Sequence, residues 1–190
     1  MTARLVVLAS GSGSTLQAVI DAVADPDFPA VVVAAGTDRP ACQAMVRAAT
    51  ADIPTFAHAL ADYPDRAGWD AALASELESW KPDLVVLAGF MRVIAGSTVE
   101  RFPMVNTHPS LLPSFPGAHA IPDALAHGVK LSGVTVHRVD AGLDSGPILA
   151  QAAVEVLADD TVESLTARIQ AVEKPLFVQA IRQLCREASA

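Results

Sequence analysis

Residues 4–15 read RLVVLASGSGST, and this stretch decides the class of fold. Its first six residues are almost continuously apolar, which is typical of a strand buried on both faces in a parallel sheet. Glycine and serine follow at once, so the strand is expected to enter a tight loop. Apolar residues then recur at helical spacing, at Leu16, Val19, Ile20 and Val23. The stretch predicts a strand, a loop and a helix, with Ser14 or Thr15 as the helix N-cap.

The same alternation continues through the first half of the chain. Residues 30–35 (AVVVAA) and 83–88 (DLVVLA) are further apolar runs, and residues 64–80 carry a helical pattern between them. Pro40, after the second run, is expected in the first turn of another helix. Strands that alternate with helices favour a doubly wound, mostly parallel α/β sheet with helices on both faces. Ligands of such sheets bind at the carboxyl ends of the strands.

Shorter strands and one long helix are expected in the second half. Strand patterns cover residues 104–108, 133–139 and 148–156. A closing helix follows, for which Asp160 and Glu163 have the spacing of a capping box. One face of this helix carries Leu165, Ile169, Val172 and Leu176. Pro175 is expected to kink or break it. No internal repeat or linker interrupts the pattern, so one domain is expected over residues 1–190.

Composition places the chain among globular proteins. Of its 190 residues, 52% are hydrophobic and 18% are charged, and a domain of this size buries roughly 70% of its unfolded surface. Lys and Arg number 13 against 21 Asp and Glu, which leaves a net charge of -8. That balance disfavours a nucleic-acid partner, because such binding depends on basic side chains that neutralise phosphates.

Several locations and chemistries are disfavoured. The N-terminus is too short and too weakly charged for a signal peptide, and no apolar run reaches the roughly 18 residues that span a bilayer. Cys42 and Cys185 stand far apart, so neither a disulfide framework nor a thiolate zinc site is indicated. None of the five histidines has metal-ligand spacing, and no GxSxG elbow offers a serine nucleophile. The chain is expected to be cytoplasmic, with reduced thiols and no membrane partner.

The loop at residues 10–15 (SGSGST) is a candidate phosphate-binding loop. Glycines let backbone N–H groups turn toward an anion, and the helix N-terminus adds further donors. A dinucleotide fingerprint requires glycine where Leu16 stands, and a Walker loop requires a Lys-Ser or Lys-Thr pair that is absent. The loop therefore suits a small phosphorylated substrate. The alternative is a plain flexible turn with a serine cap.

A second candidate lies at residues 106–113 (NTHPSLLP), at the end of an expected strand. In an extended chain Asn106 and His108 project to the same face. An amide donor beside an imidazole can stabilise an oxyanion, and the histidine can also move a proton. The alternative is that both side chains satisfy backbone groups of the loop, and the spacing alone does not decide between the two.

Residues 140–147 (DAGLDSGP) form a glycine-rich loop between two expected strands. A carboxylate from this loop, Asp140 or Asp144, can hold His108 in its charged form. Aspartate is also a common turn residue that hydrogen-bonds its own backbone, and this segment alone favours the turn. His137, in the preceding strand, is expected to be a core histidine that lines the site.

Four stretches together resemble the formyltransferase superfamily. They read LVVLASGSGSTLQAVID, DLVVLAGFMRVI, NTHPSLLPSFPGAH and GVTVHRVDAGLDSGPILAQ, and the similarity runs from Leu5 to about Glu173. The NxHPSLLP segment with a later Asp-Ser-Gly-Pro loop marks the superfamily. The serine-glycine loop is typical of its nucleotide-substrate branch, which uses a formylated folate to formylate a glycinamide ribonucleotide in purine synthesis. The resemblance implies a Rossmann-like fold with a single formyltransferase domain.

The resemblance also implies which residues form the site. The catalytic set would be Asn106, His108 and Asp144. The phosphate and the amine of the ribonucleotide would contact Gly13, Ser14, Thr15 and Glu173. The formylated folate would contact Arg66, Met91, Arg92, Val93, Ile94 and Asn106, together with Asp140, Ala141, Gly142, Leu143 and Asp144.

In the reaction that the resemblance implies, the amine of the ribonucleotide attacks the formyl carbon carried on folate N10. Asn106 and protonated His108 would stabilise the charge on the formyl oxygen. Asp144 would keep His108 charged and help to move a proton. 10-Formyltetrahydrofolate would be the formyl donor, and no metal is required. The partners would be small-molecule substrates, and the chain would be a monomer or a homodimer.

Three other functions fit parts of the sequence. A transfer-RNA formyltransferase shares the Asn, His and Asp set but normally adds a C-terminal RNA-binding domain and a basic face, whereas this chain is acidic and ends at Ala190. A formylfolate hydrolase normally carries an N-terminal regulatory domain, whereas the first strand here is expected from Arg4. A non-catalytic nucleotide-binding module would use the 10–15 loop, with Asp38 on a ribose. It would leave residues 106–117 and 140–147 unexplained.

Overall fold

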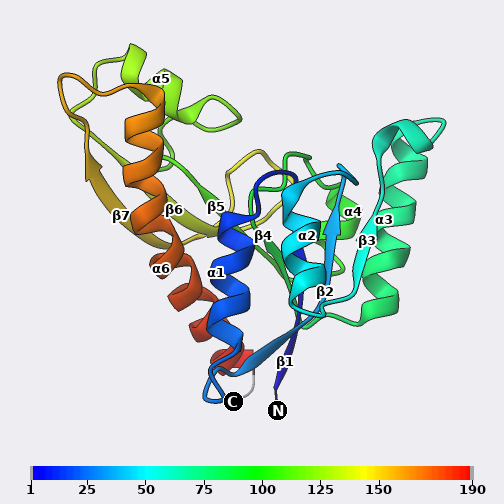
Figure 1. The fold of residues 1–190 in the computed structure, drawn as a ribbon. Helices are drawn as coiled ribbons and strands as arrows, with labels where there is room; N and C mark the ends of the chain where they lie inside the picture. Colours follow the sequence, from blue (N-terminus) through cyan, green and yellow to red (C-terminus); the bar gives the residue numbers. More distant parts are fainter. Residues whose placement is uncertain (1, 189–190) are drawn as a thin grey trace.

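The computed structural model describes residues 2–188, which build a seven-stranded sheet (Figure 1). Its strands are β1 (Ala3–Leu8), β2 (Ala30–Thr37), β3 (Thr55–Ala57), β4 (Leu84–Leu87), β5 (Met104–His108), β6 (Leu131–Arg138) and β7 (Ile148–Glu155). Their order across the sheet is β3-β2-β1-β4-β5-β6-β7. β1 to β5 pair in parallel, whereas β6 is antiparallel to both β5 and β7. The predicted mostly parallel α/β sheet is confirmed.

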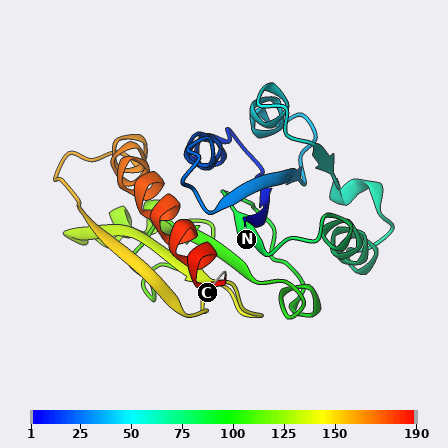
Figure 2. The same cartoon turned by 90° about the horizontal axis from the view of Figure 1, so that it is seen from below.

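Helices cover both faces of this sheet (Figure 2). They are α1 (Ser14–Val23), α2 (Gln43–Thr50), α3 (Arg66–Trp80), α4 (Gly96–Val99), α5 (Ala120–Ala126) and α6 (Val162–Ala188), with a short 3-10 helix at Leu60–Asp62. α1, α2 and the second half of α6 pack on one face, and α3 packs on the other. The predicted double-wound arrangement of helices is therefore confirmed.

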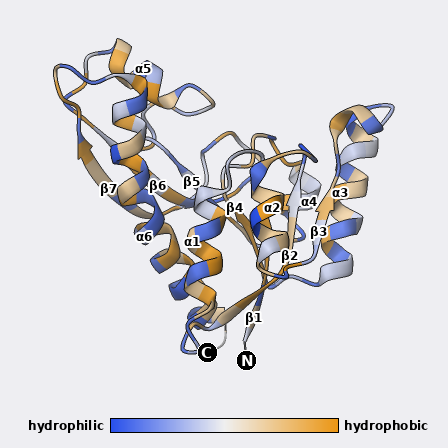
Figure 3. Cartoon of the chain, in the orientation of Figure 1, coloured by the Kyte–Doolittle hydropathy of each residue, from blue (hydrophilic) through white to orange (hydrophobic). Residues whose placement is uncertain are grey.

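β1 shows why the opening stretch decides the fold. Leu5 and Val7 face the core beneath α1 and α6, whereas Val6 and Leu8 face the core beneath α3. All four side chains are fully buried, because a central strand between two helical layers meets no water on either face. Full burial of such a side chain is worth about 1.5–3 kcal/mol, so the apolar run stabilises the centre of the sheet. In Figure 3 the central strands are mainly apolar, and the helices around them carry both apolar and polar residues.

The start of α1 differs from the sequence prediction. Neither Ser14 nor Thr15 caps the helix; the N-cap is Gly13, in the left-handed conformation with φ 72°, and no side chain caps the first turn. The Thr15 hydroxyl instead donates to Glu173 Oε1 at 3.1 Å. Pro40 was also misplaced by the prediction, because α2 begins only at Gln43 and Pro40 lies in the preceding turn.

α6 corrects two further predictions. Its capping box joins Thr161 and Ser164, one residue later than predicted, with each side chain accepting from the other's backbone N–H. The helix does not break at Pro175 but continues to Ala188. A proline within a helix costs about 3 kcal/mol. The buried side chains that follow it, including Phe177 and Ile181, outweigh this cost by packing into the sheet core. The predicted apolar face of α6 is confirmed.

Two simpler predictions concern thiols and membranes. Cys42 and Cys185 form no disulfide with each other, and Cys185 is buried. Burial raises the pKa of the Cys185 thiol to about 11, which keeps it protonated at neutral pH. Among residues 2–188, no helix is long and apolar enough to cross a membrane.

Candidate active site

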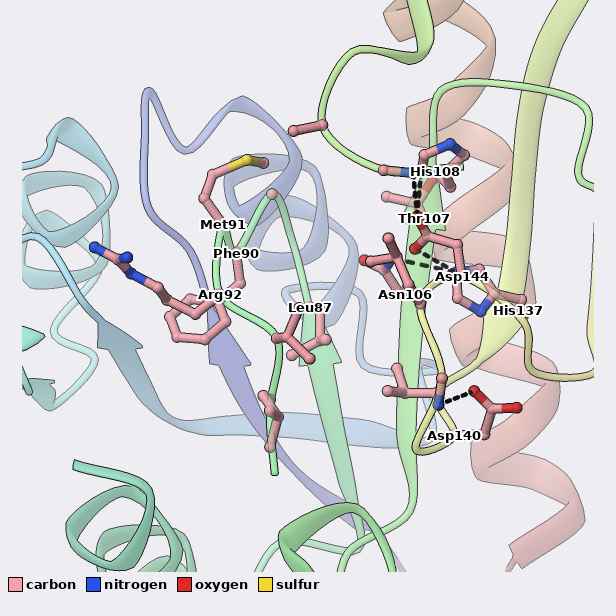
Figure 4. Close-up of a pocket in the computed structure, with 18 of the residues that line it drawn as sticks. Leu87, Phe90, Met91, Arg92, Asn106, Thr107, His108, His137, Asp140 and Asp144 are labelled. Atoms are coloured by element: carbon pink, nitrogen blue, oxygen red, sulfur yellow. Dashed lines mark hydrogen bonds and ion pairs between the residues drawn. The ribbon is translucent and has the colours of Figure 1, made fainter. Parts of the chain in front are cut away.

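A pocket of about 250 Å³ opens at the carboxyl ends of β4 and β5 (Figure 4). Four segments line it: the end of β4 with the loop that follows (residues 87–94), the end of β5 with Pro109, residues 117–118, and the end of β6 with the loop that follows (residues 137–144). We call it the donor pocket. Its lining residues are Leu87, Gly89, Phe90, Met91, Arg92, Val93, Ile94, Asn106, Thr107, His108, Pro109, Gly117, Ala118, His137, Val139, Asp140, Gly142, Leu143 and Asp144. This position agrees with the rule that ligands of parallel α/β sheets bind at the carboxyl ends of the strands.

β5 presents two of the predicted catalytic side chains to this pocket. Asn106 and His108 alternate with Thr107 along the strand, so both project from one face of the sheet. The antiparallel register sets Asn106 opposite His137 of β6. Asn106 Nδ2 lies 3.2 Å from His137 Nε2. Asn106 and His108 therefore line the same pocket, as their shared strand face predicts, but the direct contact of the Asn106 amide is with His137.

His108 has an acceptor at each ring nitrogen. Nε2 donates to the carbonyl oxygen of Phe115 at 2.8 Å, and Nδ1 lies 3.3 Å from Asp144 Oδ2. The ring is 5% exposed, so water does not compete for these positions. Only the imidazolium carries a hydrogen on both nitrogens, so a charged ring can donate to both oxygens at once.

Asp144 is held beside His108 by its own loop. Its backbone lies in the left-handed region, with φ 51°, and Oδ2 accepts from the Gly117 N–H at 2.8 Å. Oδ1 lies 3.6 Å from His137 Nε2. The hydrogen bond with His137 is the main cause that lowers the pKa of Asp144, with help from Gly117 and from the charge of His108, while burial acts in the opposite direction. Asp144 is therefore a carboxylate at neutral pH.

The two aspartates of this loop have different roles. Asp140 accepts from the Gly142 N–H at 3.0 Å and from the Ser145 hydroxyl at 2.9 Å, which is the turn geometry expected from its sequence context. Asp144 points instead toward His108 and His137 (Figure 4). The turn interpretation holds for Asp140 and is wrong for Asp144.

His137 is buried as predicted, but the sequence reasoning missed its partners. It is 2% exposed, and Nδ1 donates to the Arg138 carbonyl oxygen at 2.9 Å. Its Nε2 therefore faces Asn106 as an acceptor when the ring is neutral, and faces Asp144 as a donor when it is charged. The sequence did contain a signal for this placement: the alternation of side chains along β6 sets His137 and Thr135 on the same face, opposite Asn106 and His108.

The predicted phosphate-binding residues lie after β1, the neighbour of β4 in the sheet. Gly13, Ser14 and Thr15 form the start of α1 and do not line the donor pocket. α2 supports this loop from behind: the Ala44 N–H donates to Gly11 at 3.1 Å, and Arg47 Nε donates to the Ser12 carbonyl at 2.9 Å.

Glu173 joins the phosphate loop to α6. Its carboxylate accepts from the Thr15 hydroxyl, so residues 158 positions apart meet at the start of α1. Burial raises the pKa of Glu173, and the Thr15 hydrogen bond and the charge of Lys174 only partly oppose this effect. Thr15 and Glu173, which the resemblance assigns to the phosphate and the amine of one ribonucleotide, are therefore in contact.

Most predicted folate-binding residues line the donor pocket, but two do not. Ala141 is absent from its wall, and Arg66 lies outside it, bonded to Asp70 at 3.0 Å and to the Val93 carbonyl. The Arg66 guanidinium also stacks 4.8 Å over the ring of Trp69. Arg66 therefore contacts the 89–94 loop from outside. At the mouth, three exposed apolar side chains offer surface to an apolar ligand: Met91, Val93 and Leu143.

Asp38 is not available to a ribose. Its side chain is fully buried, and its two oxygens accept from the Ser10 hydroxyl and from Arg92 Nε. The interpretation of Asp38 as a ribose ligand is therefore wrong. Within residues 2–188, no group of three His, Cys, Asp or Glu side chains is placed to hold a metal ion.

Asn106, His108 and Asp144 thus line one pocket at the carboxyl edge of a mostly parallel sheet, and comparison with known proteins shows the class of enzyme to which this chain belongs. The sequence profile described as "Formyl transferase" matches residues 3–181. The chain belongs to the formyl transferase family and is a transferase.

The relatives of this chain within the family include phosphoribosylglycinamide formyltransferases. The phosphoribosylglycinamide formyltransferase of Mycobacterium tuberculosis is 52% identical over 184 residues, which cover 96% of this chain and 85% of that protein. The phosphoribosylglycinamide formyltransferase of Bacillus subtilis is 36% identical, covering 95% of this chain and 94% of that protein. The crystal structure of glycinamide ribonucleotide transformylase 1 from Symbiobacterium toebii superimposes with a TM-score of 0.95 at 45% identity, covering 98% and 89% of the two chains.

Proposed function

We propose that this chain transfers the formyl group of 10-formyltetrahydrofolate to the amine of glycinamide ribonucleotide. The products are formylglycinamide ribonucleotide and tetrahydrofolate, as in purine biosynthesis. The observation that carries the proposal is the contact of His108 with Asp144 beside Asn106, in a pocket next to a phosphate-type loop. The similarity to phosphoribosylglycinamide formyltransferases supports the choice of acceptor.

In the proposed reaction the amine attacks the formyl carbon, and the carbonyl electrons move to the formyl oxygen. The Asn106 amide and the His108 imidazolium stabilise that oxyanion, each as a donor in a site with little water. The C–N10 bond then breaks as the carbonyl reforms. A proton passes from the attacking nitrogen to N10, and Asp144, between two histidines, is the group that relays it.

The two substrates would occupy different parts of the edge of the sheet. Gly13, Ser14 and Thr15 would bind the phosphate through the N-terminus of α1, and Glu173 would accept from the amine. The folate would enter the donor pocket, against the 89–94 loop on one side and residues 140–144 on the other. Met91 and Leu143 at the mouth suit its flat ring.

A direct assay tests the proposal. The protein is incubated with 10-formyltetrahydrofolate and glycinamide ribonucleotide, and formation of tetrahydrofolate is followed spectroscopically. We expect turnover only when the ribonucleotide is present. Turnover without an amine would identify a hydrolase, and turnover with methionyl-transfer RNA would identify a different acceptor.

The proposal also covers the domain organisation, cellular location and oligomeric state of the enzyme. We propose one domain over residues 1–190, a cytoplasmic location and a monomer or homodimer. The net charge of -8 supports small-molecule rather than nucleic-acid partners. Sedimentation analysis at several protein concentrations tests the oligomeric state.

A further inference from the structure

Asp38 is a fully buried carboxylate beside the donor pocket that does not line it. It directly follows β2, and none of its side chain is exposed. Burial of a charge is unfavourable unless the charge is paired and hydrogen-bonded. The partners of Asp38 therefore indicate what its charge is used for.

Each oxygen of Asp38 holds a different part of the site. Oδ1 accepts from the Ser10 hydroxyl at the end of β1. Oδ2 accepts from Arg92 Nε at 2.7 Å. The Ser10 oxygen in turn accepts from the Met91 backbone N–H at 2.9 Å. Because the single hydrogen of the serine hydroxyl goes to Asp38, a lone pair is left facing Met91.

These bonds fix the loop that forms one wall of the pocket. Gly89, Met91 and Arg92 all line the donor pocket. The Ser10 N–H donates to the Gly89 carbonyl at 3.0 Å. The loop is therefore held at Gly89, Met91 and Arg92 by residues that follow β1 and β2. Two of these three bonds depend on the Asp38 carboxylate.

The direction of Arg92 agrees with a supporting role. Its side chain extends away from Asn106, while neighbouring Met91 lies at the pocket (Figure 4). Arg92 is about one-third exposed, and its charge neutralises the buried Asp38. A second arginine, Arg39, is 4.0 Å from the same carboxylate but is mostly in solvent. The Arg92 ion pair is therefore the closer and more buried contact.

We propose that Asp38 is a positioning residue for the formyl donor: through Ser10 and Arg92 it holds residues 89–92 in the shape that receives the folate. The identity of the ligand rests on the proposed function, whereas the restraint on the loop does not. Loss of the carboxylate charge should loosen one wall of the donor pocket and leave the phosphate loop and Glu173 in place.

The kinetic test compares Asp38→Asn with Asp160→Asn. Asp160 is a matched control, because its side chain is 3% exposed and pairs with Arg168 at the start of α6, outside the pocket. We expect Asp38→Asn to raise the KM for 10-formyltetrahydrofolate about 10-fold, with kcat and the KM for the ribonucleotide within about twofold of wild type. Asp160→Asn should change none of the three constants.

A second measurement needs no substrate. Amide hydrogen exchange at Met91 reports the bond to Ser10 directly, and we expect it to quicken about 10-fold in both Asp38→Asn and Ser10→Ala. In Asp160→Asn it should stay at the wild-type rate. If the wild-type protein fails to formylate the ribonucleotide, the proposed function fails while this exchange experiment still tests the loop.

Two results would overturn the positioning role. One is wild-type exchange at Met91 in both Asp38→Asn and Ser10→Ala. The other is a fall in the apparent kcat of Asp38→Asn with both KM values unchanged, which would indicate a loss of folded protein rather than a change in the donor pocket. Thermal melting of each variant identifies that second case, and Ser10→Ala keeps the test open if Asp38→Asn does not fold.

Discussion

His108 is the residue whose surroundings explain most of the site. Phe115 and Asp144 each offer it an oxygen, and the burial of the ring prevents water from replacing either one. The carbonyl of Phe115 belongs to the backbone, whereas Asp144 provides a charged side chain that a substitution can neutralise. Asn106, two residues earlier on the same strand face, is uncharged, and its amide nitrogen lies 3.2 Å from His137 Nε2.

We expect Asn106→Ala to fold and to bind both ligands but to lose turnover by roughly 100-fold or more, the usual effect of removing one oxyanion donor. The variant also leaves His137 Nε2 without its amide partner, so a small loss of thermal stability should accompany it. Turnover and both dissociation constants are to be measured. Near-normal turnover would show that Asn106 only supports the loop.

The pairing of His108 with Asp144 predicts a specific pH dependence. In Asp144→Asn the carboxylate is replaced by a neutral group of the same size, so the imidazolium that the proposed reaction requires loses its counter-charge. We expect turnover to fall about 100-fold above neutral pH and to survive best toward acidic pH. In that background His108→Ala should cost little more, because residues that act as one unit are not additive.

The measurement is a pH profile of turnover for wild type, both single variants and the double variant. Losses that multiply independently would mean that the 3.3 Å contact between the two side chains has no catalytic role. A flat profile in Asp144→Asn would mean the same.

At the scale of the elements, the start of α1 depends on its contact with α2. A Cβ on Gly13 would lie 2.5 Å from Ala44 Cα, and its φ of 72° disfavours any side chain. We expect Gly13→Ala to lower the free energy of unfolding by at least about 2 kcal/mol, since the left-handed backbone alone costs about 1–2 kcal/mol. Gly11→Ala, where a Cβ meets nothing within 4 Å, should change it by less than about 0.5 kcal/mol. Urea denaturation measures both, and equal effects would contradict this account.

The contact between α1 and α6 predicts a stability that varies with pH. Burial raises the pKa of Glu173, so the folded state binds more protons than the unfolded state above the unfolded pKa of about 4.3. Stability is therefore present at lower pH and decreases as pH rises through this window. Glu173→Gln has no proton to lose, so it should be more stable than wild type at pH 7 and equal to it below about pH 4.

Glu163→Gln is the control on the same helix. The backbone N–H of Glu163 and the Thr161 side chain lower the pKa of Glu163, so its contribution has the opposite sign and is lost as pH falls. Thermal melting between pH 3 and 8 compares the two variants. If Glu173→Gln were less stable than wild type at pH 7, the carboxylate would be stabilising and the argument from burial would be wrong.

The elements also show where sequence patterns are sufficient. β1, β4 and β5 were predicted within one or two residues, because continuous apolar runs between turn signals have few other solutions. The cap of α1 was wrong, because the Thr15 hydroxyl is drawn to Glu173, a partner 158 residues away. The break at Pro175 was wrong because tertiary burial outweighs local propensity.

For the whole molecule, the sequence predicts the sheet but not which side chains from different strands come into contact. The contact between Asp144 and His108 follows from β6 lying beside β5, which no local pattern specifies. The same holds for the Asp38 network, whose three side chains follow β1, β2 and β4. Alternation alone could place His137 in the site, yet its choice between Asn106 and Asp144 depends on distances that only the folded chain defines.

The separation of the two proposed subsites predicts how ligands stabilise the whole molecule. The donor pocket lies beyond β4 and β5, and the phosphate loop follows β1, so neither set of residues overlaps the other. A ligand that binds only the folded state at 100 times its Kd adds about 2.7 kcal/mol to the free energy of unfolding. The ribonucleotide and a non-reactive folate together should therefore add about 5.4 kcal/mol. Ligands that compete for one site would gain only about 0.4 kcal/mol from the second ligand.

Urea denaturation of the wild-type protein with each ligand alone and with both distinguishes these cases, and no turnover occurs because the folate is non-reactive. Two folate analogues at the same multiples of their Kd provide the competing control. A combined stabilisation close to that of one ligand would place the ribonucleotide inside the donor pocket and remove the phosphate loop from the site. Additive stabilisation keeps the two subsites separate, because each ligand then binds a surface that the other leaves free.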